Sequence, residues 1–320
     1  MTVVKESIQP KQLIKELLEL QLQSESYVFR GVSKAEQNNP TIKRVRGNDS
    51  NEYFDLSHEE MGLLYDFMHL GSPYFNKNLD TLDYIAIAQH YEIPTRLLDW
   101  TFDPYVALYF SISRVKFPDD GIYRIFYTDL SRNLLVRSVT DIQPQRKISL
   151  GMKNNIEKYI AFVNTIESDL YSFAKSFKIL DDLNLKTNIR DLNFQVEELR
   201  SIKFDKYDDD GTTDSVEEIK MKRVMENKLL FFNAAHTNDR LIAQQGIFSI
   251  PKSLEGEKSK EEVENLAECY EFSLTEKNRV KVIEYLEKMN YKSTRLFPEL
   301  SSLGQALKER KLKENYKKLY

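Results

Sequence analysis

The stretch that decides the fold is "HYEIPTRLLDWTFDPYVALYFS", residues 90–111. It begins with polar side chains around a Pro-Thr-Arg turn and ends in an almost uniformly apolar run. Asp103 followed by Pro104 combines a helix-capping side chain with proline at the first helical position, which predicts that a helix begins at Pro104. Because that helix is apolar almost all round, we expect it to be buried.

The residues just before this helix predict a strand that carries polar groups. If residues 95–101 form a strand, Thr95, Asp99 and Thr101 lie on one face of the sheet, and Arg96 and Trp100 lie on the other. Two interpretations remain open. Either these groups bind a ligand, or Arg96 and Asp99 satisfy each other or the neighbouring backbone while Trp100 fills the core.

Outward from this stretch, hydrophobic periodicity predicts further helices and strands. Helices are predicted at 10–24, 58–70, 80–91 and 276–289, the first of them burying Leu13, Leu17 and Leu18. Strands are predicted at 26–31, 121–129, 133–142, 228–234, 246–251 and 269–274. The sequence therefore predicts an α+β fold with a mixed or antiparallel sheet core and flanking helices.

In the middle of the chain the pattern of apolar residues changes from that of strands to that of helices, which predicts a helical insertion at 150–228. Large apolar residues recur there at steps of three and four from Ile156 to Phe177, which indicates a long amphipathic helix that could contact a protein partner. We expect a core domain in two parts, 1–149 and 229–305, and a basic C-terminal tail at 306–320.

Composition restricts the class of protein. The 320 residues carry a net charge of −4 with a pI near 5.8, which argues against binding nucleic acid through the charge of the whole protein but leaves a local basic patch open. A lone cysteine, Cys269, cannot form an intrachain disulfide. Without a Sec-type signal or an apolar run of about 18–20 residues, we expect a cytoplasmic protein that does not enter a membrane. The sequence does not indicate the oligomeric state.

We expect no metal site. An acidic segment matches positions three to twelve of a calcium-binding EF-hand loop at Asp208, Asp210, Gly211, Thr212, Asp214 and Glu217. The first position of that loop is Lys206, which replaces a required carboxylate with a positive charge. The four histidines, His58, His69, His90 and His236, are scattered along the chain and suggest no zinc site.

Other candidate binding residues lie at the ends of predicted elements. Arg30 precedes Gly31 at a strand end, where a guanidinium could hold a phosphate or carboxylate and the glycine could let the ligand approach the backbone. His90, at a helix end, could act as a general base or as a packing residue. Gln244 and Gln245 precede a strand; an amide there would orient a ligand, since it cannot act as an acid or base.

Five segments in this order resemble the FRG domain family, which is named for a Phe-Arg-Gly segment, here Phe29 to Gly31. They are "YVFRGVSK", "NPTIKRV", "AIAQHYEIPTRLLDWTFDPYVALYFSI", "NDRLIAQQGIFSIP" and "RLFPELSSLGQAL". The resemblance spans roughly residues 10 to 305 and leaves 150–228 without a recognised motif. It implies a bacterial or phage-encoded protein, in some cases one that takes part in phage defence.

The order of these segments is also similar to that of mono-ADP-ribosyltransferases. The resemblance implies that Arg30 holds the dinucleotide NAD, that Thr101 supports the pocket, and that Gln245 or Gln244 stands where those enzymes have a glutamate. An amide carries no charge to stabilise a developing cation, so catalysis would need another acid such as Asp99.

Two functions follow from the resemblance and remain open. One is an ADP-ribosyltransferase-like enzyme that uses NAD, and the other is a non-catalytic sensor or adaptor that binds nucleic acid, a nucleotide or a phage protein. In either case we expect one cleft for a nucleotide or other phosphate-bearing ligand. Its catalytic group would be Arg30, His90, Asp99, Thr101 and Gln245, and its cofactor-binding group Arg30, Gly31, Thr95, Arg96, Tyr109 and Gln244.

Overall fold

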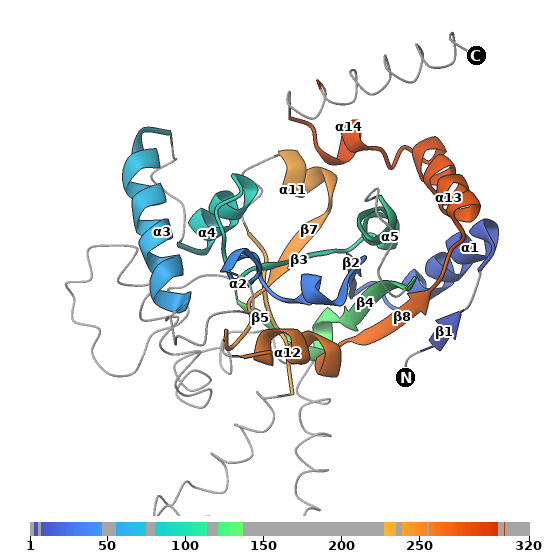
Figure 1. Ribbon diagram of the computed structural model, residues 1–320, viewed down its shortest axis with the longest axis horizontal. Helices are drawn as coiled ribbons and strands as arrows, with labels where there is room; N and C mark the ends of the chain where they lie inside the picture. Colours follow the sequence, from blue (N-terminus) through green and yellow to red (C-terminus); the bar gives the residue numbers. More distant parts are fainter. Residues whose placement is uncertain are drawn as a thin grey trace, which may run out of the picture.

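The computed structural model describes residues 3–5, 8–46, 56–74, 81–113, 121–136, 227–234, 239–254, 256–299 and 304. Nearly all of the predicted insertion at 150–228, including the Ile156–Phe177 stripe and the EF-hand-like loop, lies outside these residues, as does the tail at 306–320. The described residues form an α+β structure whose helices surround a curled sheet (Figure 1). This confirms the predicted fold class.

Eight described strands form one mixed sheet in the order β1-β8-β4-β2-β3-β7-β6-β5. The pairs β1–β8 and β5–β6 are parallel and the other pairs are antiparallel. The strands are β1 (Val3–Lys5), β2 (Tyr27–Val32), β3 (Leu98–Thr101), β4 (Tyr123–Asp129), β5 (Leu134–Val136), β6 (Leu230–Phe232), β7 (Gly246–Ser249) and β8 (Glu268–Phe272).

The helices pack on both faces of this sheet (Figure 1). They are α1 (Pro10–Gln21), α2 (Thr41–Arg46), α3 (Leu56–Gly71), α4 (Thr81–His90), α5 (Pro104–Ile112), α11 (Asp239–Ala243), α12 (Lys258–Leu266), α13 (Glu276–Lys288) and α14 (Ser293–Leu296), with short 3₁₀ turns at Ala35–Asn38, Ser72–Tyr74 and Leu130–Arg132. One hydrophobic cluster joins α1, α5 and α13 to β2, β4 and β8. A second cluster, on the other face, contains Trp100, Phe231 and Val263 of α12.

Helix α5 begins as the sequence predicts. The Asp103 side chain accepts a hydrogen bond from the Tyr105 N–H, and Pro104 occupies the first turn. The helix packs so closely on β2 that a Cβ atom at Gly31 would lie 1.7 Å from the Ala107 carbonyl oxygen. From the sequence a ligand is expected at this glycine, but in the structure the missing side chain makes room for α5.

Strand β3 is shorter than predicted, and the prediction that residues 95–97 are extended strand is wrong. Thr95 follows Pro94, and its hydroxyl accepts the Leu97 N–H, a local bond that competes with strand pairing. The Arg96 N–H donates to the Glu60 carboxylate instead of to a neighbouring strand. Thr95, Arg96 and Leu97 are consequently all buried, with no alternation between two faces.

Smaller differences concern the ends and faces of elements. In α1, Leu13 and Leu17 are buried as predicted, but Leu18 is 44% exposed and Leu20 takes the place expected for it. Strand β2 continues one residue beyond Gly31. Helix α12 was not predicted, because its sequence is mostly charged and only Val263 and Ser259 are buried.

Candidate functional site

The sheet opens between β2 and β3, and Arg30 lies at the opening. The register of these two strands contains one residue pair among the described residues, Phe29 with Thr101. Beyond that pair the Arg30 Nη1 atom donates to the Asp99 carbonyl oxygen at 2.6 Å, and Nη2 donates to the Gln37 carbonyl oxygen. The Arg30 side chain therefore connects β2 to the Asp99 carbonyl of β3 beyond the point where the two strands are paired.

The Arg30 guanidinium is a fixed, buried positive charge. The residue is 7% exposed, and its Nε atom is buried without a hydrogen-bond partner. Burial lowers the pKa of Arg30 to about 10, with Asp99 opposing this shift and Arg44 adding to it. The group is still protonated at neutral pH, but both terminal nitrogens are already bonded to backbone carbonyls.

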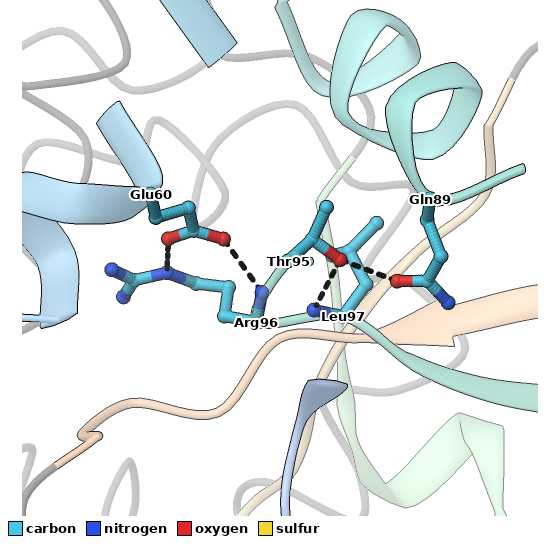
Figure 2. Close-up of polar contacts among 5 residues, drawn as sticks. All are labelled: Glu60, Gln89, Thr95, Arg96 and Leu97. Atoms are coloured by element: carbon cyan, nitrogen blue, oxygen red, sulfur yellow. Dashed lines mark hydrogen bonds and ion pairs between the residues drawn. The ribbon is translucent and has the colours of Figure 1, made fainter. Parts of the chain in front are cut away.

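Asp99 carries the exposed carboxylate beside this charge. Its Oδ1 atom accepts a hydrogen bond of 2.8 Å from the Gln89 amide nitrogen. The Gln89 amide oxygen in turn accepts from the buried Thr95 hydroxyl, as Figure 2 shows. This chain of bonds holds an anionic acceptor at the surface, next to the sheet opening.

Arg96 lies deep in the protein and binds Glu60 of α3 (Figure 2). Its Nε atom and its backbone N–H donate to the two Glu60 carboxylate oxygens, each at 2.6 Å, and both side chains are fully buried. Of the two possibilities for Arg96 and Asp99, that they satisfy each other or the neighbouring backbone, the first is wrong, since Arg96 bonds Glu60 and the Asp99 carboxylate bonds Gln89. The accompanying interpretation of Trp100 is confirmed, since its ring is in the core and its Nε1–H donates to the Ser249 hydroxyl at 2.8 Å.

Thr101 lies at the other end of β3 with the two glutamines. Its hydroxyl donates to the Gln244 carbonyl oxygen at 2.6 Å and accepts from the Asp103 N–H at 3.0 Å. The Gln244 side chain donates to the Leu296 carbonyl oxygen. Gln245 is exposed, with a positive φ of 47°, and its carbonyl oxygen accepts the Phe102 N–H. The Thr101 hydroxyl therefore joins β3 to the turn before β7.

His90, the last residue of α4, faces the C-terminal part of the described chain. Its Nε2 atom lies 3.8 Å from the Glu299 carboxylate. Burial lowers the pKa of His90, Arg240 lowers it further, and Glu299 opposes the shift, so the imidazole is neutral at pH 7. Tyr109, half-buried on α5, has its ring 6.1 Å from that of Phe110.

The structure brings the expected site residues together in two groups along β3. Arg30, Thr95 and Asp99 are connected through Gln89 and the Asp99 backbone, while Thr101, Gln244 and Gln245 are connected at the turn before β7. Since Phe29 pairs with Thr101, Arg30 and Thr101 originate on opposite faces of the sheet. That all the expected residues line one cleft remains a prediction.

Three residues that contact this site were not singled out from the sequence: Gln37, Gln89 and Glu60. Gln89 directly precedes His90, within the third of the segments that resemble the FRG family. The available signal was an amide in the last turn of an otherwise apolar helix. Gln37 contributes a backbone carbonyl, which leaves no trace in residue type.

Asp99 is an exposed carboxylate, and Arg44 of α2 is an exposed guanidinium that acts electrostatically on Arg30. Within the described ranges, no three His, Cys, Asp or Glu side chains cluster as a metal ion would require. Over those same ranges, no helix has the length and apolar character needed to cross a bilayer.

Comparison with known families places part of the chain in a described family. Residues 25–120 match the model of the FRG domain. No curated protein and no solved structure matches the chain. The matched region contains β2, β3 and α5, and with them Arg30, Gln89, Thr95 and Asp99. Through this region the chain carries an FRG domain, which bears out the family resemblance over residues 25–120 of the roughly 10 to 305 expected.

Proposed function

We propose that this FRG domain binds a nucleotide at the opening between β2 and β3, with Asp99 and Arg44 contacting the ligand. The observation that carries the proposal is the exposed Asp99 carboxylate, which Gln89 holds in place while the Asp99 backbone carbonyl accepts a hydrogen bond from the buried Arg30 guanidinium. A binding site commonly consists of a few convergent polar groups on a rigid scaffold, and here the scaffold is the sheet itself.

Arg44 supplies the second half of the recognition. It is an exposed residue of α2, its Nη2 atom donates to the Thr41 hydroxyl at 3.1 Å, and it is close enough to Arg30 to lower the pKa of that guanidinium. Helix α2 is joined to the site because the Ile42 N–H donates to the Thr95 carbonyl oxygen. Asp99 and Arg44 both act electrostatically on Arg30, and a carboxylate and a guanidinium near it would suit a ligand that bears both hydroxyl and phosphate groups.

The arrangement supports recognition without cleavage better than it supports catalysis. In the ADP-ribosyltransferase-like order, Gln245 would occupy the position of the catalytic glutamate, and an amide provides no charge for an oxocarbenium-like transition state. The Thr101 hydroxyl already donates to the Gln244 carbonyl oxygen and accepts from the Asp103 N–H, so its bonds are directed to the backbone. We therefore place the protein among nucleotide sensors, with phage defence as the setting that its family suggests.

One observation favours the enzymatic alternative. Asp99 is an exposed acid near Arg30, so it could take the role of the missing glutamate toward bound NAD. This version requires that nicotinamide be released, whereas a sensor binds NAD or ADP-ribose unchanged.

The test is calorimetric titration of the purified full chain with ADP-ribose and with NAD, followed by mass spectrometry for free nicotinamide. We expect saturable binding, weakened about tenfold in Asp99→Asn and in Arg44→Gln, because each loses a charged hydrogen-bond partner. Matched controls are Glu25→Gln and Arg132→Gln, two exposed positions that take no part in the proposed site. Absence of binding to both ligands would refute the proposal, and stoichiometric nicotinamide release would replace the sensor with the enzyme.

A further inference from the structure

We infer that the Asp99–Gln89 pair reads the ribose hydroxyls of the ligand and so distinguishes ribonucleotides from deoxyribonucleotides. The inference rests on the proposed nucleotide site and names the part of the ligand on which its specificity depends. It follows from the direction of three successive hydrogen bonds, from Leu97 to Thr95, from Thr95 to Gln89 and from Gln89 to Asp99.

The orientation of the Gln89 amide is determined by Thr95. The Thr95 hydroxyl accepts the Leu97 N–H at 3.2 Å, so its own proton is directed to the Gln89 amide oxygen. With that oxygen occupied, the NH₂ group of Gln89 faces Asp99 and donates to Oδ1. Because Thr95 is fully buried, this orientation is not exchanged by water.

At the surface, Asp99 and Gln89 together present hydrogen-bond acceptors and a donor. Asp99 is acceptor-only when ionised, and Oδ2 has no hydrogen-bond partner among the described residues. Gln89 has two amide hydrogens, one of which is used on Oδ1. A sugar hydroxyl can donate to the carboxylate and accept the second amide hydrogen, which matches this pair of groups.

The surrounding charge selects against cationic ligands. The Arg30 guanidinium bonds the Asp99 backbone, and Arg44 of α2 is close enough to Arg30 to lower its pKa. A lysine or arginine side chain of a partner at Asp99 would meet the like charge of Arg30, whereas a sugar phosphate could place its hydroxyls at the carboxylate and its phosphate toward Arg44. A phosphorylated ribose therefore fits the chemistry of both ends.

The experiment compares AMP with 2′-deoxy-AMP and 3′-deoxy-AMP by calorimetry on the full chain. We expect the wild-type protein to bind AMP about tenfold more tightly than at least one deoxy analogue, since the lost partner is a charged but solvent-accessible acceptor. In Asp99→Asn the carboxylate is replaced by an amide, and the ratio should fall to about one while binding of the deoxy analogue is unchanged. Glu25→Gln, an exposed acid outside the site, should keep the wild-type ratio.

The outcomes separate this inference from the proposed function. If AMP and both deoxy analogues bind equally to the wild-type protein, or if Asp99→Asn keeps the preference, the inference is overturned while nucleotide binding stands. If none of the three nucleotides binds, the inference is overturned, and the titrations with ADP-ribose and NAD decide separately whether the proposed nucleotide site stands. A trinucleotide of RNA that binds more tightly than AMP and than DNA of the same sequence would support ribose reading and assign the ribose to an RNA strand.

Discussion

Glu60 and Arg96 form an ion pair in which both side chains are fully buried and the Arg96 backbone is also bonded. Replacing Glu60 by an uncharged residue removes the negative charge that offsets the buried Arg96 guanidinium in a medium of low dielectric constant. Glu60→Gln should therefore lower the free energy of unfolding by about 3–5 kcal/mol, measured by urea denaturation.

The control for this prediction is the exposed ion pair of Lys15 and Glu19, whose side chains are 67% and 57% exposed. Lys15→Ala should change the stability by less than about 1 kcal/mol, because exposed pairs are screened by water. A double variant with methionine at both 60 and 96 should be more stable than Glu60→Gln. Equal stability of Glu60→Gln and the wild type would mean that the pair is not buried in solution.

At the scale of elements, the contact between α5 and β2 depends on the absence of a side chain at Gly31. A Cβ atom there would meet the carbonyl oxygen of Ala107 at 1.7 Å and the carbonyl carbon at 2.6 Å, and backbone atoms cannot move aside as a flexible side chain can. Gly31→Ala should therefore force α5 away from the sheet and lower the free energy of unfolding by about 3 kcal/mol or more.

Gly62 provides the control for the same chemical change. It lies in α3, and apart from the helix's own backbone and the adjacent residues an added Cβ would meet no heavy atom within 4 Å in the part of the chain that the structure describes. Gly62→Ala should raise stability by about 0.5–1 kcal/mol, because alanine favours the helix and restricts the unfolded chain. Thermal melts followed by circular dichroism measure both effects, and a Gly31→Ala protein that melts like the wild type would contradict the close packing.

At the scale of the whole molecule, the region that matches the FRG domain is smaller than the unit that buries its core. Residues 25–120 contain β2 and β3, whereas their other neighbours in the sheet, β4 and β7, lie outside. The cluster around α5 also needs Leu13 and Leu17 of α1 and Val282 and Leu286 of α13.

A fragment of residues 25–120 should therefore fail to fold alone, since it leaves both sheet edges and one face of α5 exposed. We expect poorly dispersed amide signals in its proton–nitrogen NMR spectrum and no cooperative melting, in contrast to the full chain under the same conditions. A cooperative transition in the fragment would show that the core contacts from α1, β4, β7 and α13 are dispensable.

The elements that could be predicted are those with strong local signals. Asp103 and Pro104 determine where α5 begins through a cap and a restricted φ angle, and the apolar run after them requires burial. Most strands were predicted because alternating or continuous β-branched and aromatic residues favour a sheet. The strand at Thr95 was mistaken because the local hydroxyl bond to Leu97 and the distant carboxylate of Glu60 override that tendency.

The sequence by itself determined the α+β class, the buried helix α5 and the resemblance to the FRG family, which the match over residues 25–120 bears out, because each rests on residue types and their local order. Only the tertiary structure decided the partners of the polar groups. Arg96 binds a residue 36 positions away, and Arg30 binds carbonyl oxygens that residue types do not reveal. The physical reason is that a buried charge or hydroxyl takes whichever partner the packing brings within hydrogen-bond distance, and packing is a property of the whole chain.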